Sequence, residues 1–341
     1  MASPENPMSP RSATAVAHPN VALVKYWGKR DAARNLPAVG SISVTLARLS
    51  TVTSVRFDPA LRGDELSIGG LPDAQALERV SKVLDRVRAS AGFELRASVE
   101  SRSDFPIGAG LASSASAFAA LALAATKAAG LERSRRDLSV LARQGSGSAA
   151  RSLFGGFVEW HRGERADGID SFAEQLLPEE AWPLAVLVAV TSGAPKSVGS
   201  SDGMEHTRLT SPYWPAWVEG APAALTAMRD AIGARDLVRV GELAEHSCLA
   251  MHAVAMAARP GLVYWNAATV AVMHAVRELR QKGVPAYFSI DAGPQVKVLA
   301  APSDAGRVRD VLRAVPGVER VIDSRPGPGA QLVDGEMESG S

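Results

Sequence analysis

The sequence contains a single cysteine, Cys248, so no disulfide can form within the chain. It also has almost no net charge, because 37 Lys and Arg residues stand against 36 Asp and Glu residues, a formal total of +1. Such a balance gives no overall field suited to nucleic acid or to an anionic membrane. No hydrophobic run approaches the length of a membrane span, and no signal peptide is recognisable at the start. We therefore expect a reduced, cytoplasmic protein that binds neither nucleic acid nor membrane.

Hydrophobic residues make up 46% of the 341 residues, which is enough for one large or two ordinary domains with cores of their own. The pattern changes at about Thr191, from alternating strands and helices to a helix-rich part. We expect two domains, over residues 12–190 and 191–324. Both ends are rich in Pro, Ser, Gly and charged residues, which predicts a disordered tail at 1–11 and a flexible tail at 325–341.

The periodicity of the apolar residues predicts a mixed α+β fold. Near the end of the chain a strand, a turn, a strand, a helix and a strand follow one another, which is typical of a two-layer α+β sandwich. The expected strands cover residues 15–24, 41–53, 184–190, 286–290, 296–299 and 318–322, and the expected helices cover residues 221–232, 236–258 and 267–282.

The most informative segment is a loop of small residues followed by a helix, PIGAGLASSASAFAALALAA, at residues 106–125. Gly108 and Gly110 let the backbone approach a ligand, and Ser113, Ser114 and Ser116 supply hydroxyls at the positive end of the helix. The loop has neither the Gly-Lys-Ser/Thr ending of a Walker A motif nor the third glycine of a dinucleotide fingerprint. It predicts a phosphate site, with an ordinary glycine-rich turn before a core helix as the alternative.

A second segment, HPNVALVKYWGKRD at residues 18–31, leads an apolar strand directly into cations and a phenol. Lys25 lies two residues beyond Leu23 and therefore shares its face of the strand, which indicates an inward-pointing lysine. The alternative is a strand end that carries solvated lysines.

A third segment, QGSGSAARSLFGGF at residues 144–157, is another loop of small residues. Backbone amides and hydroxyls of such a loop can bind phosphate, and the guanidinium of Arg151 can hold a carboxylate with two parallel hydrogen bonds. A flexible connector of similar composition is the alternative.

The fourth segment, YFSIDAGP at residues 287–294, places Asp291 at the end of an apolar strand, where a scaffold can direct a carboxylate into a cleft. An aspartate that only stabilises its own turn is equally compatible with the segment. A polar loop, KSVGSSDGM at residues 196–204, follows another buried strand; most loops of this composition are simply exposed.

Taken together and in this order, the segments resemble those of the diphosphomevalonate decarboxylases of the GHMP kinase superfamily. The resemblance covers most of the chain and includes NVALVKYWGK, SISVTL, FPIGAGLASSAS, SGSAARSLFGGFVEW, KSVGSSDGM and FSIDAGP. It implies an N-terminal domain like ribosomal protein S5 domain 2 and a ferredoxin-like C-terminal α/β sandwich. It also implies ATP-dependent decarboxylation of mevalonate 5-diphosphate to isopentenyl diphosphate, carbon dioxide, ADP and phosphate, with Mg²⁺.

The resemblance further implies a role for each matching residue. Asp291 is expected to face the C3 hydroxyl, Arg151 to hold the C1 carboxylate, and Lys25 to be their electrostatic partner. Ser114 is expected near the ATP phosphates and Mg²⁺, and Asn20 is expected to order the site. The matching substrate-phosphate residues are Tyr26, Lys29, Ser146, Gly147, Ser148 and Ser200, and the nucleotide loop comprises Gly108, Ala109, Gly110, Ser113, Ser114 and Ser116.

Two positions depart from the family pattern. Ser201 stands where some bacterial relatives carry an arginine that contacts the diphosphate, and Asp104 stands where the family often has asparagine near the nucleotide. A decarboxylase of mevalonate 5-phosphate is therefore an alternative, as is a small-molecule kinase that stops at the phosphorylated alcohol. Homodimerisation is implied by the resemblance alone.

Overall fold

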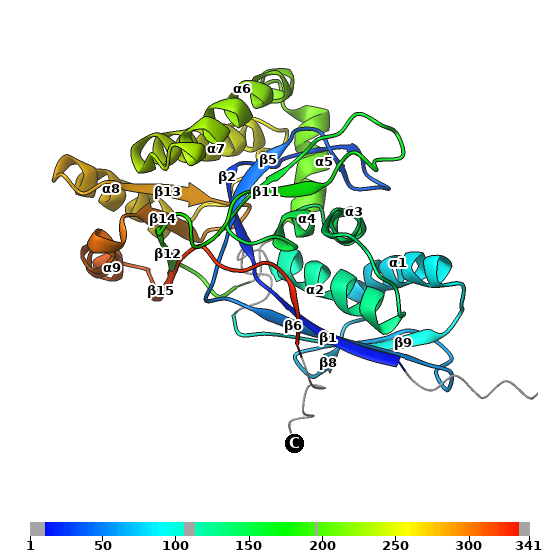
Figure 1. Cartoon of the computed structure of the whole chain (residues 1–341). Helices are drawn as coiled ribbons and strands as arrows, with labels where there is room; N and C mark the ends of the chain where they lie inside the picture. The colour runs from blue at the N-terminus through cyan, green and yellow to red at the C-terminus, as the bar shows by residue number, and fades with distance from the viewer. Residues whose placement is uncertain (1–10, 106–112, 195–196, 334–341) are drawn as a thin grey trace, which may run out of the picture.

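The computed structural model describes residues 11–105, 113–194 and 197–333 of the chain. The predicted nucleotide-loop residues Gly108, Ala109 and Gly110 lie outside these ranges. The fold is mixed α+β, as expected, with two four-stranded sheets, a six-stranded sheet and a short two-stranded ribbon among the described residues (Figure 1). No helix in the described ranges is both long enough and apolar enough to cross a membrane.

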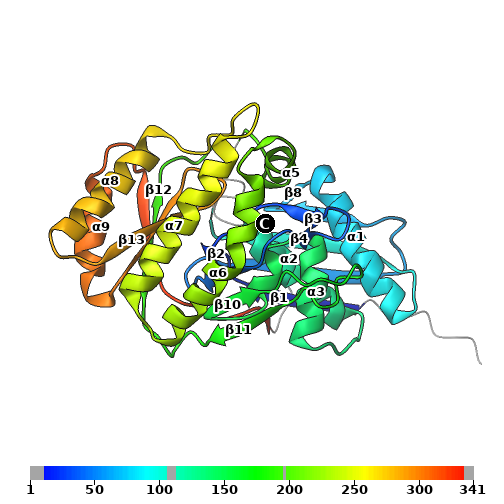
Figure 2. The ribbon, with the colours of Figure 1, turned by 90° about the horizontal axis from the view of Figure 1, so that it is seen from above.

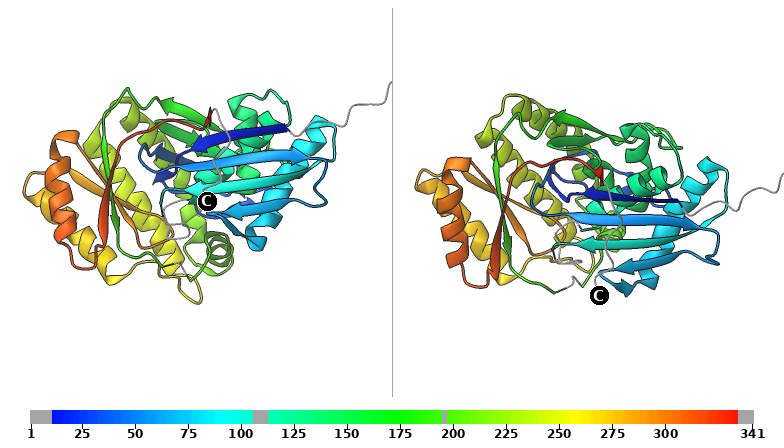
Figure 3. Two further views of the ribbon diagram at one scale, coloured as in Figure 1. Left: turned by 90° about the horizontal axis from the view of Figure 1, so that it is seen from below. Right: turned by 60° about the horizontal axis from the view of Figure 1, so that its bottom comes forward.

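The six-stranded sheet has helices on one face and lies at the bottom of Figure 1. Its strand order is β16-β1-β6-β9-β7-β8, and the same sheet is seen from its other face in Figure 3. The covering helix α2 is rich in alanine and packs closely on β1 and β6. The strands are β1 (Arg11–Ala17), β6 (Thr51–Asp58), β7 (Glu65–Ile68), β8 (Leu71–Pro72), β9 (Arg96–Ser103) and β16 (Gln331–Val333), and the helices are α1 (Ala74–Ala91), α2 (Ser113–Ala128) and α3 (Arg135–Gly145).

The second sheet has the order β11-β10-β5-β2 and is buried over most of its length. We expected one strand over residues 15–24, but the chain leaves β1 at His18 and enters β2 in this other sheet at Asn20. Pro19, which has no N–H for a strand ladder, separates the two strands. The expected strand over residues 41–53 is likewise two strands, β5 and β6. The second sheet comprises β2 (Asn20–Val24), β5 (Ser41–Thr45), β10 (Phe157–Trp160) and β11 (Ala173–Leu177), with α4 (Ala149–Ser152) beside it and the ribbon β3 (Lys29–Asp31) and β4 (Leu36–Pro37) beyond β2.

The third sheet has the antiparallel order β13-β14-β12-β15 and is buried on both faces at β12. Alternate residues of β12 enter two different cores: Leu187 packs with α8 and α9, and Val188 packs with the second sheet and α6. Figure 2 shows these helices from above. The strands are β12 (Ala185–Val190), β13 (Ala286–Ile290), β14 (Val296–Ala300) and β15 (Arg320–Ser324), and the helices are α5 (Ser200–Thr210), α6 (Trp214–Gly233), α7 (Leu237–Met256), α8 (Ala267–Gln281) and α9 (Ala305–Ala314), with a short 3₁₀ turn (Pro302–Asp304) before α9.

Residues 325–333 do not form the flexible tail that we expected. The Ala47 amide donates to the Arg325 carbonyl at 2.9 Å, the Gly327 amide donates to the Thr45 carbonyl at 2.9 Å, and β16 pairs with β1. Arg135 Nη1 also donates to the Ala330 carbonyl, at 2.6 Å. Gly327 and Gly329 of this segment run close against other backbone, where an added side chain has no room. Composition alone therefore mistook a tightly docked segment for a loose one.

Candidate active site

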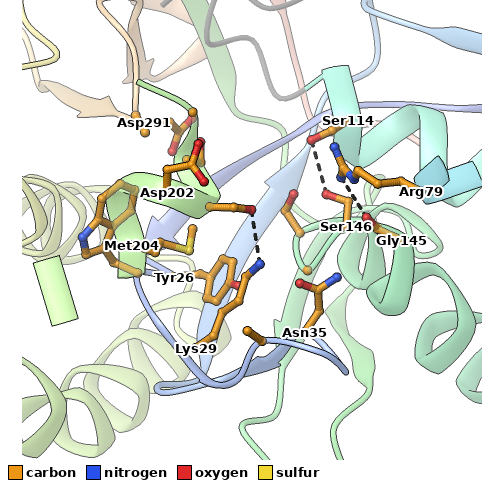
Figure 4. A pocket seen from close by; sticks show the side chains of 18 of the residues that line it. Tyr26, Lys29, Asn35, Arg79, Ser114, Gly145, Ser146, Asp202, Met204 and Asp291 are labelled. Atoms are coloured by element: carbon orange, nitrogen blue, oxygen red, sulfur yellow. Dashed lines mark hydrogen bonds between the residues drawn. The ribbon is translucent and has the colours of Figure 1, made fainter. Parts of the chain in front are cut away.

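A cavity of about 680 Å³ lies among the ends of β2 and β13, the β3–β4 ribbon and the helices α1, α2, α4 and α5, and it collects most of the residues that the sequence singled out. Figure 4 shows Asp291 and Asp202 on one side of this cavity and Arg79, Ser114 and Ser146 on the other. The predicted residues that line it are Asn20, Lys25, Tyr26, Lys29, Ser113, Ser114, Ser146, Gly147, Ser148, Arg151, Ser200 and Asp291.

Asp291 lies directly after β13 and is held between two lysines. Lys25 Nζ donates to Asp291 Oδ1 at 2.5 Å, and Lys297 Nζ donates to Asp291 Oδ2 at 2.9 Å. The lysine side chains are 1% and 2% exposed, whereas that of Asp291 is 23% exposed. Lys25 thus points inward, as its place on the strand predicted, and Asp291 does more than stabilise its own turn.

Burial alone would raise the pKa of the Asp291 carboxyl, because it penalises the charged form. The charges and hydrogen bonds of Lys25 and Lys297 outweigh that effect and hold this pKa well below its ordinary value. Asp291 is consequently an anion at neutral pH, available to stabilise positive charge. In this conformation it is a poor acceptor of protons.

Helix α7 supports the strand that ends at Asp291. The Ile290 amide donates to Cys248 Sγ at 3.2 Å, and a ring nitrogen of His252 lies 3.3 Å from the Ile290 carbonyl oxygen. Burial raises the pKa of the Cys248 thiol to about 11 and lowers the pKa of His252 to about 4. Both groups are therefore uncharged at neutral pH.

Arg151 is buried on α4 and is oriented by two neighbours. Its Nε and Nη2 donate to Asn20 Oδ1 at 3.0 and 2.9 Å, and its Nη1 donates to Ser41 Oγ at 2.6 Å. Asn20 is itself fixed, because its Nδ2 donates to the Ser148 carbonyl at 3.1 Å and to Ser152 Oγ at 2.8 Å. Burial lowers the pKa of Arg151 to about 10, which leaves the guanidinium charged at neutral pH. A fixed planar cation thus lines the same cavity as Asp291.

Tyr26 and Gly147 meet at the cavity wall. The Tyr26 hydroxyl is buried and has no hydrogen-bond partner among the described residues, which makes it a donor for a ligand. Its ring packs edge-on against Trp160, with 4.8 Å between the ring centroids. A Cβ atom at Gly147 would lie 2.9 Å from both Tyr26 Oη and Trp160 Cη2. Only glycine fits here without displacing the tyrosine.

We expect Gly147→Ala to raise KM for the phosphorylated substrate about tenfold, because the new methyl group must displace the Tyr26 hydroxyl, and small misplacements in a site are costly. Overpacking should also lower the free energy of unfolding by about 1–3 kcal/mol. Steady-state kinetics and chemical denaturation measure the two effects. Gly306→Ala is the matched control, since a Cβ atom at Gly306 meets nothing within 4 Å. If Gly147→Ala has the KM of wild type, the added methyl group does not disturb the Tyr26 hydroxyl and the proposed role of the glycine is wrong.

The start of α2 brings serine hydroxyls to the other side of the cavity. Ser114 is exposed there, and Ser146 Oγ donates to Ser114 Oγ at 3.3 Å (Figure 4). Ser113 also lines the cavity. Ser116, which we expected in the nucleotide loop, lies fully buried beneath them, with its hydroxyl 2.7 Å from Thr51 Oγ1 and donating to the Ser113 carbonyl at 3.1 Å. It therefore stabilises the helix start and does not reach the cavity.

Lys29, the first residue of β3, reaches the cavity. Its Nζ donates to Ser201 Oγ at 3.2 Å, at the start of α5 where Ser200 also lies (Figure 4). Burial and the charge of Arg79 lower the pKa of Lys29, although the carboxylates of α5 oppose this effect. Lys29 and Arg79 are thus close enough to act on each other electrostatically, with the carboxylates of Asp202 and Glu205 also acting on Lys29.

Family models match almost the whole chain. The diphosphomevalonate decarboxylase-like N-terminal domain matches residues 17–173, and the mevalonate 5-diphosphate decarboxylase C-terminal domain matches residues 186–329. The chain belongs to the diphosphomevalonate decarboxylase family. It shares that family's GHMP kinase fold, as we expected from its motifs.

Individual members of the diphosphomevalonate decarboxylase family align over nearly their full length. The diphosphomevalonate decarboxylase of Candida albicans is 35% identical over 94% of this chain and 97% of its own. The phosphomevalonate decarboxylase of Haloferax volcanii is 37% identical over 95% and 98%. The solved structure of MDDEF in complex with MVAPP, AMPPCP and magnesium is 39% identical, covers 95% of this chain and 99% of its own, and superposes with a TM-score of 0.89.

Several residues in or directly behind the cavity were missed from the sequence. Lys297 lies behind the cavity and carries an alternation signal, because it is a lysine in the middle of an apolar strand. Arg79 gave no signal, since a charged residue on an amphipathic helix usually faces solvent; its Nη2 donates to the Gly145 carbonyl at 2.8 Å. The others are Asn35, Gln75, Lys82, Gln144 and Asp202.

The carboxylate of Asp104, one of the two departures, is bound by Ser50, which directly precedes β6. One carboxylate oxygen accepts from the Ser50 amide and the other from the Ser50 hydroxyl, both at 2.8 Å. The added negative charge is thus held between the end of β9 and the start of β6.

Proposed function

We propose that this chain catalyses the ATP-dependent decarboxylation of mevalonate 5-diphosphate to isopentenyl diphosphate, with release of carbon dioxide, ADP and phosphate. One observation carries the proposal: an ionised Asp291, held by Lys25, lines the same cavity as the fixed guanidinium of Arg151 and the serines of α2. Family membership supports it, since MDDEF was solved with MVAPP and the ATP analogue AMPPCP.

The proposed reaction requires a carboxylate near C3 of the substrate, which Asp291 provides. A tertiary hydroxide leaves poorly, so transfer of phosphate from ATP to the C3 hydroxyl provides a better leaving group. The carbon left behind develops positive charge as that group departs, and the nearby Asp291 anion stabilises it in a cavity of low dielectric. The depressed pKa of Asp291 suits this electrostatic task better than general-base catalysis at neutral pH.

Arg151 and Lys25 hold the C1 carboxylate of the substrate in this proposal. The planar guanidinium fixes the orientation of the carboxylate, so that the bond to carbon dioxide can break as the C3 group leaves. Asn20 is a positioning residue, because it holds Arg151 through Oδ1 and reaches α4 through Nδ2.

The phosphate groups are placed at the polar walls. We assign the substrate phosphates to Tyr26, Lys29, Ser146, Gly147, Ser148 and Ser200, and the nucleotide phosphates to Ser113, Ser114 and the loop of Gly108, Ala109 and Gly110. The orphaned Tyr26 hydroxyl and the space at Gly147 fit an anionic ligand. The Ser114 hydroxyl offers an oxygen donor of the kind that Mg²⁺ prefers. When bound, Mg²⁺ neutralises phosphate charge.

Substrate choice is the experiment that tests the proposal. We expect kcat/KM for mevalonate 5-diphosphate to exceed that for mevalonate 5-phosphate at least about tenfold, because Lys29 and Arg79 supply charge for a second phosphate and each well-placed contact is worth 1–3 kcal/mol. Release of carbon dioxide and ADP is measured for both substrates with ATP and Mg²⁺.

The same assay separates the alternatives. A preference for the monophosphate would place the chain with its Haloferax volcanii relative in activity. A stable 3-phosphorylated product without gas would identify a kinase. If the wild-type protein shows no turnover and its active-site variants bind nucleotide as well as it does, the chain is an ATP-binding protein of another class.

We further propose that the protein acts in the cytoplasm as a homodimer, as the family resemblance implies. We propose two domains, with β12 assigned to the C-terminal one because it pairs with β14 and β15, so that the division falls before Ala185 and not between residues 190 and 191 as the sequence suggested. Limited proteolysis and analytical ultracentrifugation test the division and the oligomeric state.

A further inference from the structure

Lys297 is a buried lysine in the middle of an apolar strand. In β14 it lies opposite Ser289 of β13 and Val188 of β12, so it has strand neighbours on both sides. Its side chain is 2% exposed. Burying an ammonium group costs several kcal/mol unless it is well paired. The ion pair with Asp291 provides the pairing that a buried lysine at this position needs.

The two lysines that hold Asp291 differ in their access to ligands. Lys25 lines the cavity, and an anionic substrate entering the cavity competes with Asp291 for its ammonium group. Lys297 reaches Oδ2 from β14 and is not among the cavity-lining residues of the described chain. Asp291 therefore has one partner that a substrate can share and one that it cannot reach.

We propose that Lys297 is a positioning residue for the decarboxylation. By binding Asp291 Oδ2 from behind, it fixes the plane of the carboxylate and keeps it ionised while the substrate engages Lys25. This inference rests on the proposed function and deepens it, since it names a residue that controls the anion on which the chemistry depends.

The charged and titratable groups around Asp291 agree with this role. Lys25 from the end of β2, Lys297 from β14 and Arg151 from α4 are cationic, and each acts electrostatically on Asp291. On α7, His252 and Cys248 are neutral at neutral pH. Without Lys297, one of the two cations that contact Asp291 is lost, so the pKa of the carboxyl must rise.

The test compares wild type with Lys297→Met, which keeps the length of the side chain and removes its charge. We expect kcat to fall about 10–100-fold, the range found when a group that orients a metal ligand is removed, with KM changed less than about threefold. We also expect kcat to decline at higher pH on the acidic side than in wild type, because a raised pKa lets Asp291 protonate sooner.

Two further variants distinguish positioning from packing. Lys297→Arg restores the charge, so we expect its acidic limb to coincide with that of wild type and its kcat to recover in part. Arg280→Met is the matched control: Arg280 pairs with Glu245 of α7, which accepts from the Phe288 amide, so it supports β13 without touching Asp291. Arg280→Met should leave the acidic limb in place. Circular dichroism verifies folding.

A measurement without turnover keeps the inference separate from the proposed function. The ¹³C carboxyl resonance of Asp291, identified by its loss in Asp291→Asn, should titrate at higher pH in Lys297→Met than in wild type. A wild-type carboxyl titration in Lys297→Met overturns the inference, whether or not the enzyme accepts mevalonate 5-diphosphate. The inference is also overturned if Lys297→Met has the kcat of wild type. It is overturned as well if Lys297→Arg loses as much kcat as Lys297→Met does. If Lys297→Met does not fold, Lys297→Gln is measured with the same criteria.

Discussion

Asp291→Asn is expected to lower kcat at least about 10³-fold while the protein stays folded, because a neutral amide cannot stabilise the developing positive charge at C3. The amide keeps the size of the carboxylate, so the cavity retains its shape. The change also leaves Lys25 and Lys297 without their common anion, and the two ammonium groups then repel each other. Release of labelled carbon dioxide measures the effect.

Asp323→Asn is the control for this substitution. Asp323 lies in β15 of the same sheet and pairs at the surface with Arg309, and neither residue is among those that line the cavity. The Asp323→Asn protein should turn over substrate at the wild-type rate. Near-normal turnover in Asp291→Asn, with folding verified by circular dichroism, would remove the carboxylate from the mechanism.

Arg151→Gln is expected to have the second-largest effect, a loss of about 10²–10³ in kcat/KM. Glutamine cannot supply the charge or the two parallel donors that orient a carboxylate. Arg151→Lys should recover little, because an ammonium group is a point charge and cannot reach Asn20 and Ser41 at once as the guanidinium does. Initial rates over a range of substrate concentrations separate kcat from KM.

Arg309→Gln is the matched control for Arg151, since its guanidinium pairs only with Asp323 among the ion pairs of the described residues. Equal losses in both variants would indicate a general loss of stability. An active Arg151→Lys protein would show that charge alone is sufficient, and the proposed orienting role would then be wrong.

Local sequence was enough to find the polar segments of the site, because each one follows a regular element that can be read from periodicity. Asp291 directly follows one apolar strand. Lys25 lies at the end of another, on the same face of that strand as Leu23. The helices over residues 236–258 and 267–282 agree closely with α7 and α8 for the same reason.

Contacts between segments that are far apart in the chain could not be derived in this way. Arg79 reaches the cavity because α1 packs beside α3, which no local pattern encodes. Ser116 stands one helical turn from Ser113 in α2 and yet faces Thr51 of β6. The docking of residues 325–333 was hidden because Gly and Pro serve close backbone contact as well as flexible linkers.

The pairing of β16 with β1 joins residues from opposite ends of the chain. During synthesis β1 emerges from the ribosome early, whereas its edge partner emerges after more than 300 further residues. Until then β1 is an edge strand of the six-stranded sheet, and its unpaired amides and carbonyls can pair with another nascent chain. A chain shortened at Ser324 would keep every described cavity-lining residue and still carry that open edge for its whole lifetime.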